Sequence, residues 1–353
     1  MTPFDLNQFQ SDERRNYLEN LLKRGEEAFD SIKAAYAPHN DTRLEMCYVN
    51  QQTLNAYASQ TNDRYLVEIE ISCPLLIDAL LKKILSDPNV LPELPVDERS
   101  LMEWKLPFTE GIDNIELEKS LEIKLDDHRF HISRALADFC MMFILFHEIG
   151  HVCCGHTSGS RFYFKEERYS EYLGLEKWFR RGTFLRRAWE IDADMFAGFL
   201  LCQTFDAFLG TKQASSLTKA FAFINGNRST LVGLVLAALS SVFIYLSQKN
   251  YQIHNLNSHP SPALRSKAVG NSVIANISKD KGIPKEALIE SRIDYMAQFF
   301  TTMEDIGILD WDKFDAQFAD SDKLLSRDYL IQRRFRKSCQ RWSIVPVSLW
   351  GQD

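Results

Sequence analysis

A strong excess of charge of either sign is missing from this chain of 353 residues. It has 41 lysines and arginines against 48 aspartates and glutamates, a net charge of −7, and its basic residues are spread along the chain. Proteins that bind nucleic acid usually gather positive charge on one face, so we expect no nucleic-acid partner. The hydrophobic share of 45% and the charged share of 25% argue against a disordered or fibrous protein and predict an ordinary globular one.

A regular cysteine framework is missing as well. The seven cysteines are an odd number without repeated spacing, which fits a reducing compartment better than an oxidising one. The first residues also lack the charged and apolar regions of a signal peptide, so we expect a cytoplasmic protein. Cys153 and Cys154 are adjacent, a spacing unsuited to a closed zinc knuckle, and we interpret them as small packing residues.

One segment is long and uncharged enough to raise the question of a membrane. Residues 229–247 contain no charged side chain over 19 positions, close to the minimum that spans a bilayer. Arg228 and Lys249 flank the segment on both sides, so charge gives no orientation. Serine and threonine side chains within it favour a buried core helix, with membrane contact as the less favoured alternative.

The remaining pattern predicts an α+β protein that is mostly helical. Amphipathic periodicity and apolar runs predict helices at 11–36, 74–85, 132–154 and 285–303. Residues 44–49 and 65–71 are rich in β-formers and predict two strands around the turn-like residues 61–63. Prolines and acidic residues dominate from 86 to about 111 and predict a long irregular connection.

The motif that carries chemistry is His147-Glu148-Ile149-Gly150-His151, which follows the apolar run 139–146. Residues four apart share one face of a helix, so both histidines can reach one metal ion while Glu148 points beside it. Two neutral imidazoles hold Zn2+ and leave positions open, and a neighbouring carboxylate can take the proton from a bound water. The motif therefore predicts part of a zinc site with its own general base. A third ligand must come from elsewhere.

A second acidic pattern supplies a candidate for that ligand. Glu190 and Asp194 share one face of a predicted apolar helix, where carboxylates are costly unless they are used. We expect Glu190 to bind zinc and Asp194 to accept the free ring N–H of a ligand histidine. Asp192 should point elsewhere, towards solvent. The competing candidates for the third ligand lie in a strongly charged segment and are Glu166, Glu167, Glu171 and Glu176.

A third pattern begins at His259, where Pro260 and Pro262 fix the entry to a helix and leave the histidine on the loop before it. A histidine held there can donate a hydrogen bond to the oxyanion that forms when water attacks a peptide carbonyl. Arg265 would be a buried charge partner nearby. Without the first two motifs, a His-Pro sequence predicts only a turn.

Together these motifs resemble those of gluzincin metallopeptidases of the HtpX and CAAX prenyl protease type, with the related Oma and Bep peptidases. In that family a further histidine follows the H-E-x-x-H motif, as His156 does here. Residues 190–194 are similar to its E-x-x-A-D motif, and residues 259–265 to its H-P-x-x-x-x-R motif. Asn55-Ala56 resembles the start of an early strand element. The similar elements occur in the family's order over about 42–270.

The resemblance implies a zincin-like metallopeptidase domain over 42–270, with a small sheet beside the active-site helix. Residues 1–41 and 271–353 would then be helical extensions. The family usually has a short link before the catalytic helix, whereas here about 86–130 would be an insertion able to cover the cleft.

The resemblance also implies roles for single residues. Zinc would lie on His147, His151 and Glu190, with Glu148 as the base. Asp194 and His156 would support the ligands, and His259 and Arg265 would lie near the substrate. An edge strand at Asn55 and Ala56 would pair with the substrate backbone, as an extended peptide adds to a sheet.

The function predicted from the sequence is a zinc-dependent endopeptidase that acts on a protein or peptide. One alternative is a defence or toxin-like protease acting on one specific host protein. Phage-exclusion peptidases of the Lit type also use H-E-x-x-H in a compact intracellular protein and are a related alternative. Another is a catalytically silent binding module in which zinc only stabilises the fold.

Overall fold

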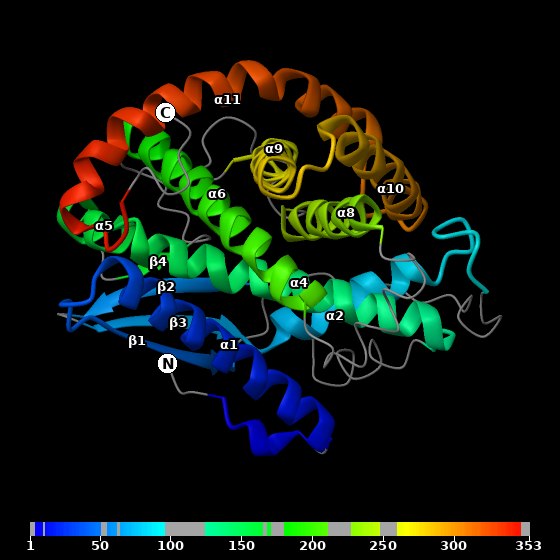
Figure 1. The fold of residues 1–353 in the computed structure, drawn as a ribbon, viewed down its shortest axis with the longest axis horizontal. Coiled ribbons are helices and arrows are strands. Elements are labelled where there is room, and N and C mark those ends of the chain that lie inside the picture. Colours follow the sequence, from blue (N-terminus) through cyan, green and yellow to red (C-terminus); the bar gives the residue numbers. More distant parts are fainter. Residues whose placement is uncertain are drawn as a thin grey trace.

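Helices dominate the molecule, and a small sheet lies along one side of them (Figure 1). This is the α+β, mostly helical class predicted from the sequence. The computed structural model describes residues 4–9, 11–50, 55–61, 64–95, 124–164, 168–170, 180–210, 227–247 and 260–346.

The helices predicted at 11–36, 74–85, 132–154 and 285–303 are confirmed, with ends that differ by up to five residues, as α1 (Asp12–Tyr36), α2 (Ser72–Leu85), α4 (Asp127–Cys153) and α10 (Lys285–Asp305). The other helices of the described residues are α5 (His156–Phe164), α6 (Arg180–Gly210), α8 (Arg228–Ser247), α9 (Pro262–Lys281) and α11 (Trp311–Cys339). Two short 3-10 helices are η1 (Leu6–Gln8) and η3 (Gln340–Trp342). The strands are β1 (Arg43–Val49), β2 (Ala56–Thr61), β3 (Arg64–Glu70) and β4 (Arg168–Ser170).

Within the described residues, the sheet has four strands in the order β1-β3-β2-β4. Both predicted strands exist, as β1 and β3, but they pair in parallel and are not the two arms of the turn. The strand that enters the turn is β2, which pairs antiparallel with β3 and with β4. Ala58, Ser59 and Gln60 have weak β-propensity, so pairing on both sides determines this strand, and the local pattern did not predict it.

Helix α4 runs through the centre of the molecule and carries the H-E-x-x-H motif at its C-terminal end (Figure 1). Asp126 caps its start by accepting hydrogen bonds from the backbone N–H groups of His128 and Arg129. Strand β2 contacts α4 on one side, and helices α6 and α8 contact it on the other. Most of its side chains are buried, so the motif lies inside the protein.

Helices α4 and α8 are long and apolar enough to cross a membrane, by length and composition alone. In both, 89% of the apolar window is buried inside the protein. Helix α8 contacts α4, α9 and α10, which cover it on several sides. It is therefore the buried core helix that we predicted at 229–247.

The predicted extensions share one hydrophobic core with the rest of the chain, which includes Leu18 of α1, Phe143 of α4 and Phe300 of α10. The boundary predicted at residue 270 falls inside α9. Of the predicted insertion, residues 86–95 pack on the core and residues from Asp127 onward belong to α4, whereas 96–123 lie outside the described residues.

Candidate metal centre

Helices α4 and α6 approach each other closely at Gly150. A Cβ atom added to this glycine would lie 3.3 Å from backbone atoms of Ala193 and 3.2 Å from the ring of Phe196. The separation of packed helices depends on the side chains at their contact, and here α4 contributes none. The glycine within the motif thus lets histidines on α4 face a carboxylate on α6.

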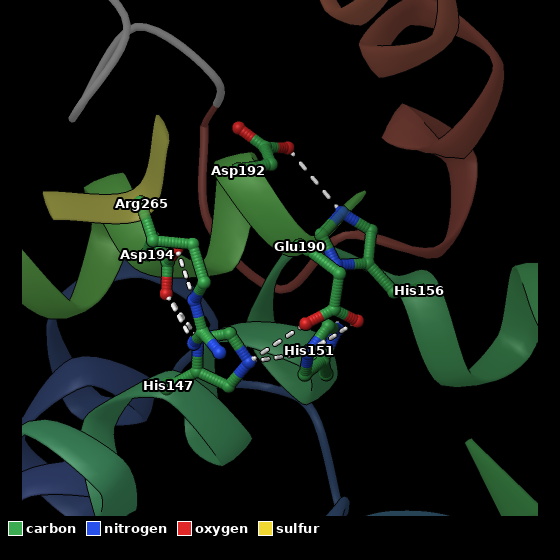
Figure 2. A network of polar contacts seen from close by, with 7 residues as sticks. All are labelled: His147, His151, His156, Glu190, Asp192, Asp194 and Arg265. Atoms are coloured by element: carbon green, nitrogen blue, oxygen red, sulfur yellow. Dashed lines mark hydrogen bonds and ion pairs between the residues drawn. The ribbon is translucent and has the colours of Figure 1, made fainter. Parts of the chain in front are cut away.

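Three donor groups meet between these helices (Figure 2). Nε2 of His147 lies 3.0 Å from Nε2 of His151 and 3.3 Å from Oε2 of Glu190. Nε2 of His151 lies 3.6 Å from Oε1 of Glu190. Ligand atoms about 2.0 to 2.1 Å from a zinc ion, at tetrahedral angles, lie about 3.3 Å apart. The structure therefore brings the predicted ligands together at a spacing that fits zinc.

These donors are almost fully buried, and the carboxylates beside His147 favour positive charge there. The exposed fraction is 2% for His147, 1% for His151 and 0% for Glu190. Burial lowers the pKa of His147, but the carboxylates of Asp194 and Glu190 outweigh burial and raise this pKa well above its ordinary value. A site that stabilises the positively charged, doubly protonated form of a buried imidazole also favours a metal cation. Burial lowers the pKa of His151 well below its ordinary value, so that ring is neutral.

Asp194 supports His147 from behind, as predicted. Its Oδ1 lies 2.8 Å from Nδ1 of His147, and Arg265 of α9 donates to both carboxylate oxygens at 2.8 and 2.9 Å. Burial raises the pKa of Asp194, but Arg265 and His147 more than offset it, so the pKa falls below its ordinary value. An ionised Asp194 holds the proton of His147 on Nδ1 and leaves Nε2 free for a metal.

Arg265 is the buried charge partner that we predicted near the site, and its nearness to a substrate stays a prediction. Its guanidinium group binds Asp194 and lies 4.6 Å from the ring centre of Phe243, and the residue is only 7% exposed. Arg265 therefore holds Asp194 in place. His259, predicted to stabilise the oxyanion, lies outside the described residues, and so do the competing ligands Glu166, Glu167, Glu171 and Glu176.

His151 is supported in a different way, through a second histidine. Its Nδ1 lies 3.1 Å from Nδ1 of His156, and Nε2 of His156 lies 3.3 Å from Oδ2 of Asp192 (Figure 2). Our prediction that Asp192 faces solvent is wrong, since it is 2% exposed. Helical spacing places Asp192 on the other side of α6 from Glu190, but α5 begins at His156 and brings its ring to that side.

Cys154, His156 and Asp192 form a second group whose ligand atoms all lie within 4.8 Å of one another. We interpreted both adjacent cysteines as packing residues. Cys153 is fully buried in the hydrophobic core, in agreement with that interpretation, whereas Cys154 also belongs to this polar group.

Glu148, the predicted base, follows His147 on α4 and is 2% exposed. Successive residues of an α-helix are about 100° apart around its axis, so Glu148 lies beside the face that carries the ligands. Glu148 and the three candidate ligands are therefore all nearly inaccessible to solvent in this structure.

The predicted substrate edge at Asn55 and Ala56 stays a prediction, because the described pairing of β2 with β4 does not reach these two residues. Strand β2 pairs with β4 over residues 57–59, so β4 forms the edge there, and Asn55 and Ala56 lie just before the paired residues. The charged segment around 168–170 gave no strand signal, because its pairing with β2 depends on contacts far apart in the sequence.

Three further residues shape the site and were missed. Gly150 permits the helix contact, Asp192 binds His156, and the ring of Trp189 stacks on His156 with ring centres 5.4 Å apart. The sequence could have predicted a buried partner for Asp192. A carboxylate on an apolar helix is costly unless it is paired, and this applies to Asp192 as much as to Glu190.

Comparisons with known proteins give no relative of this chain: no family model, no curated protein and no solved structure matches it.

Proposed function

We propose that the protein is a zinc-dependent endopeptidase of the gluzincin type, which hydrolyses peptide bonds of a protein substrate. The observation that carries the proposal is the spacing of 3.0 to 3.6 Å among donor atoms of His147, His151 and Glu190. Two histidines and one glutamate are the protein ligands of catalytic zinc sites that keep a position open. Structural zinc sites usually have four protein ligands, most often cysteines.

Each residue of the site then has a chemical role. Bound zinc would supply a Lewis acid that polarises the scissile carbonyl and makes water more acidic. Glu148 takes the proton from the attacking water and passes it to the leaving amine. Asp194, held by Arg265, keeps the proton of His147 on Nδ1. His259 is the donor that we expect at the oxyanion.

The near-complete burial of the site favours a peptidase with restricted access. A general protease needs an open cleft, whereas Glu148 and the three ligands are at most 2% exposed. Opening of such a site by one particular protein would explain the burial. A defence or toxin-like peptidase that acts on one host protein is therefore our second candidate.

We also propose that the protein works in the cytoplasm. The seven cysteines are an odd number without a regular spacing, which fits a reducing compartment better than an oxidising one.

Zinc content and cleavage of an unfolded test protein, measured on wild type and on Glu148→Gln, test the first proposal. We expect one zinc per chain in both, with hydrolysis lost at least a hundredfold in the variant. Asp127→Asn, at an exposed carboxylate of the same helix, is the control and should retain full activity. Equal activity of wild type and Glu148→Gln would contradict the proposal.

If wild type, Glu148→Gln and Asp127→Asn all fail to cleave the test protein, two further measurements distinguish the protease specific for one host protein from the silent binding module. Toxicity in cells that disappears with Glu148→Gln would support the protease specific for one host protein. A zinc ion with four protein ligands and no open position would instead support the silent binding module.

A further inference from the structure

The two ligand histidines are held in place by different means. His147 contacts the carboxylate of Asp194 directly, at 2.8 Å. His151 contacts His156, and only His156 contacts a carboxylate, that of Asp192. Both carboxylates come from α6, two residues apart in the sequence. We call Asp192, His156 and His151 the buried triad, since each is at most 2% exposed.

The protons of the buried triad follow from the chemistry of imidazole. A histidine that binds a metal through Nε2 carries its proton on Nδ1 and donates from there. In His151 that nitrogen faces Nδ1 of His156 at 3.1 Å, so His156 has to accept at Nδ1. A neutral imidazole has one N–H group, so the proton of His156 lies on Nε2, which faces Asp192 at 3.3 Å.

We propose that Asp192 is a positioning residue: by accepting the Nε2 proton of His156, it fixes the tautomer of His156 and thereby the orientation of the metal ligand His151. The inference rests on the proposed zinc site, because the direction of the hydrogen bonds follows from metal binding at Nε2 of His151. Each contact of the buried triad then has one donor and one acceptor, and the last acceptor is a carboxylate.

The packing around His156 supports a positioning role, because it fixes the plane of the ring. The indole of Trp189 lies nearly parallel to it, at an interplanar angle of 14°. Gly159 allows this stacking, since a Cβ atom there would lie 3.0 Å from the indole. Gly155 has a φ of 78°, which favours glycine, and directs the chain from α4 into α5 so that His156 turns back towards His151.

The same protons argue against a second metal ion on Cys154, His156 and Asp192. Such an ion would need the lone pair of Nε2 of His156, the atom that faces Asp192. That nitrogen carries the proton when His151 binds zinc through its own Nε2. The buried triad and a second ion therefore exclude each other, and one zinc per chain is expected.

Zinc affinity, measured by competition with a chelator, tests the proposal on the full chain. Asp192→Ala should weaken zinc binding about 10- to 100-fold, the usual effect of removing the hydrogen-bond partner behind a ligand. Asp192→Asn keeps an acceptor oxygen and should lose less. His156→Phe should also weaken zinc binding. The double variant with Asp192→Ala should bind zinc no more weakly than His156→Phe alone, because Asp192 acts on His151 only through His156.

The ring nitrogens give a second readout, which a merely structural role would not move. In zinc-loaded protein with 15N-labelled histidine, His156 should carry its proton on Nε2, and Asp192→Ala should produce a mixture of tautomers. Unchanged zinc affinity in Asp192→Ala would overturn the proposal, as would two zinc ions per wild-type chain falling to one in this variant. If wild type binds no zinc at all, the proposed function fails.

Discussion

Single residues carry the candidate metal centre, and their spacing along two helices made much of it predictable. His147 and His151 are four apart, as are Glu190 and Asp194, and the structure places each pair on one helix face turned towards the other. Asp192 was not predictable in this way, because its partner His156 reaches it from α5. The contact between Asp192 and His156 depends on the turn at Gly155, and the spacing of residues along a helix does not predict that turn.

The pair of Asp194 and Arg265 provides a prediction at this scale. Arg265→Met should leave Asp194 buried without its main cation and destabilise the fold by about 3 to 5 kcal/mol, measured by denaturant unfolding. The double variant with Asp194→Leu removes both charges and should be less unstable than the sum of the single variants. Additive losses would show that the two residues act independently.

Arg129 is buried for a reason unconnected with the metal centre. Its guanidinium group donates five hydrogen bonds to backbone carbonyls of the segment before α4, at Leu85, Asp87, Leu91, Leu94 and Pro95. Arg129→Met should leave these acceptors unsatisfied and lower the free energy of unfolding by at least about 3 kcal/mol. Arg43→Met, at an exposed arginine, should change it by less than about 0.5 kcal/mol. A similar effect in both variants would contradict this account.

At the scale of elements, helices α1, α2, α4 and α10 were predicted well because their apolar pattern extends over many residues. Strand β2 was missed because residues such as Ala58 and Gln60 have little β-propensity of their own. Strand β4 is only three residues long, too short for any periodic signal. The local pattern was thus informative where an element is long, and uninformative where pairing with distant residues decides the structure.

Helices α8 and α10 pack so closely that a glycine is needed at their contact. A Cβ atom on Gly233 would lie 2.7 Å from backbone atoms of Ser291, whereas one on Gly198 of α6 would make ordinary contact at 3.4 Å or more. Gly233→Ala should therefore destabilise the protein by about 1 to 3 kcal/mol. Gly198→Ala should stabilise it by about 0.5 to 1 kcal/mol through helix propensity. If Gly233→Ala and wild type had equal midpoints of thermal unfolding, α8 and α10 would not be as tightly packed as the structure shows.

For the whole molecule, a metal bound between α4 and α6 should also stabilise the fold. A ligand at about 1,000 times its dissociation constant adds about 4 kcal/mol to the native state. Removing zinc with a chelator should therefore lower the midpoint of thermal unfolding, and added zinc should restore it. Glu190→Gln should show little response to either treatment. A wild-type midpoint that does not depend on zinc would contradict this prediction.

The most direct test of the central claim is X-ray absorption at the zinc edge of the loaded protein. A site built from His147, His151 and Glu190 should show only nitrogen and oxygen neighbours at about 2.0 to 2.2 Å, with the imidazole pattern of two histidines. A sulfur neighbour at about 2.3 Å would place the metal on Cys154 instead and contradict the account.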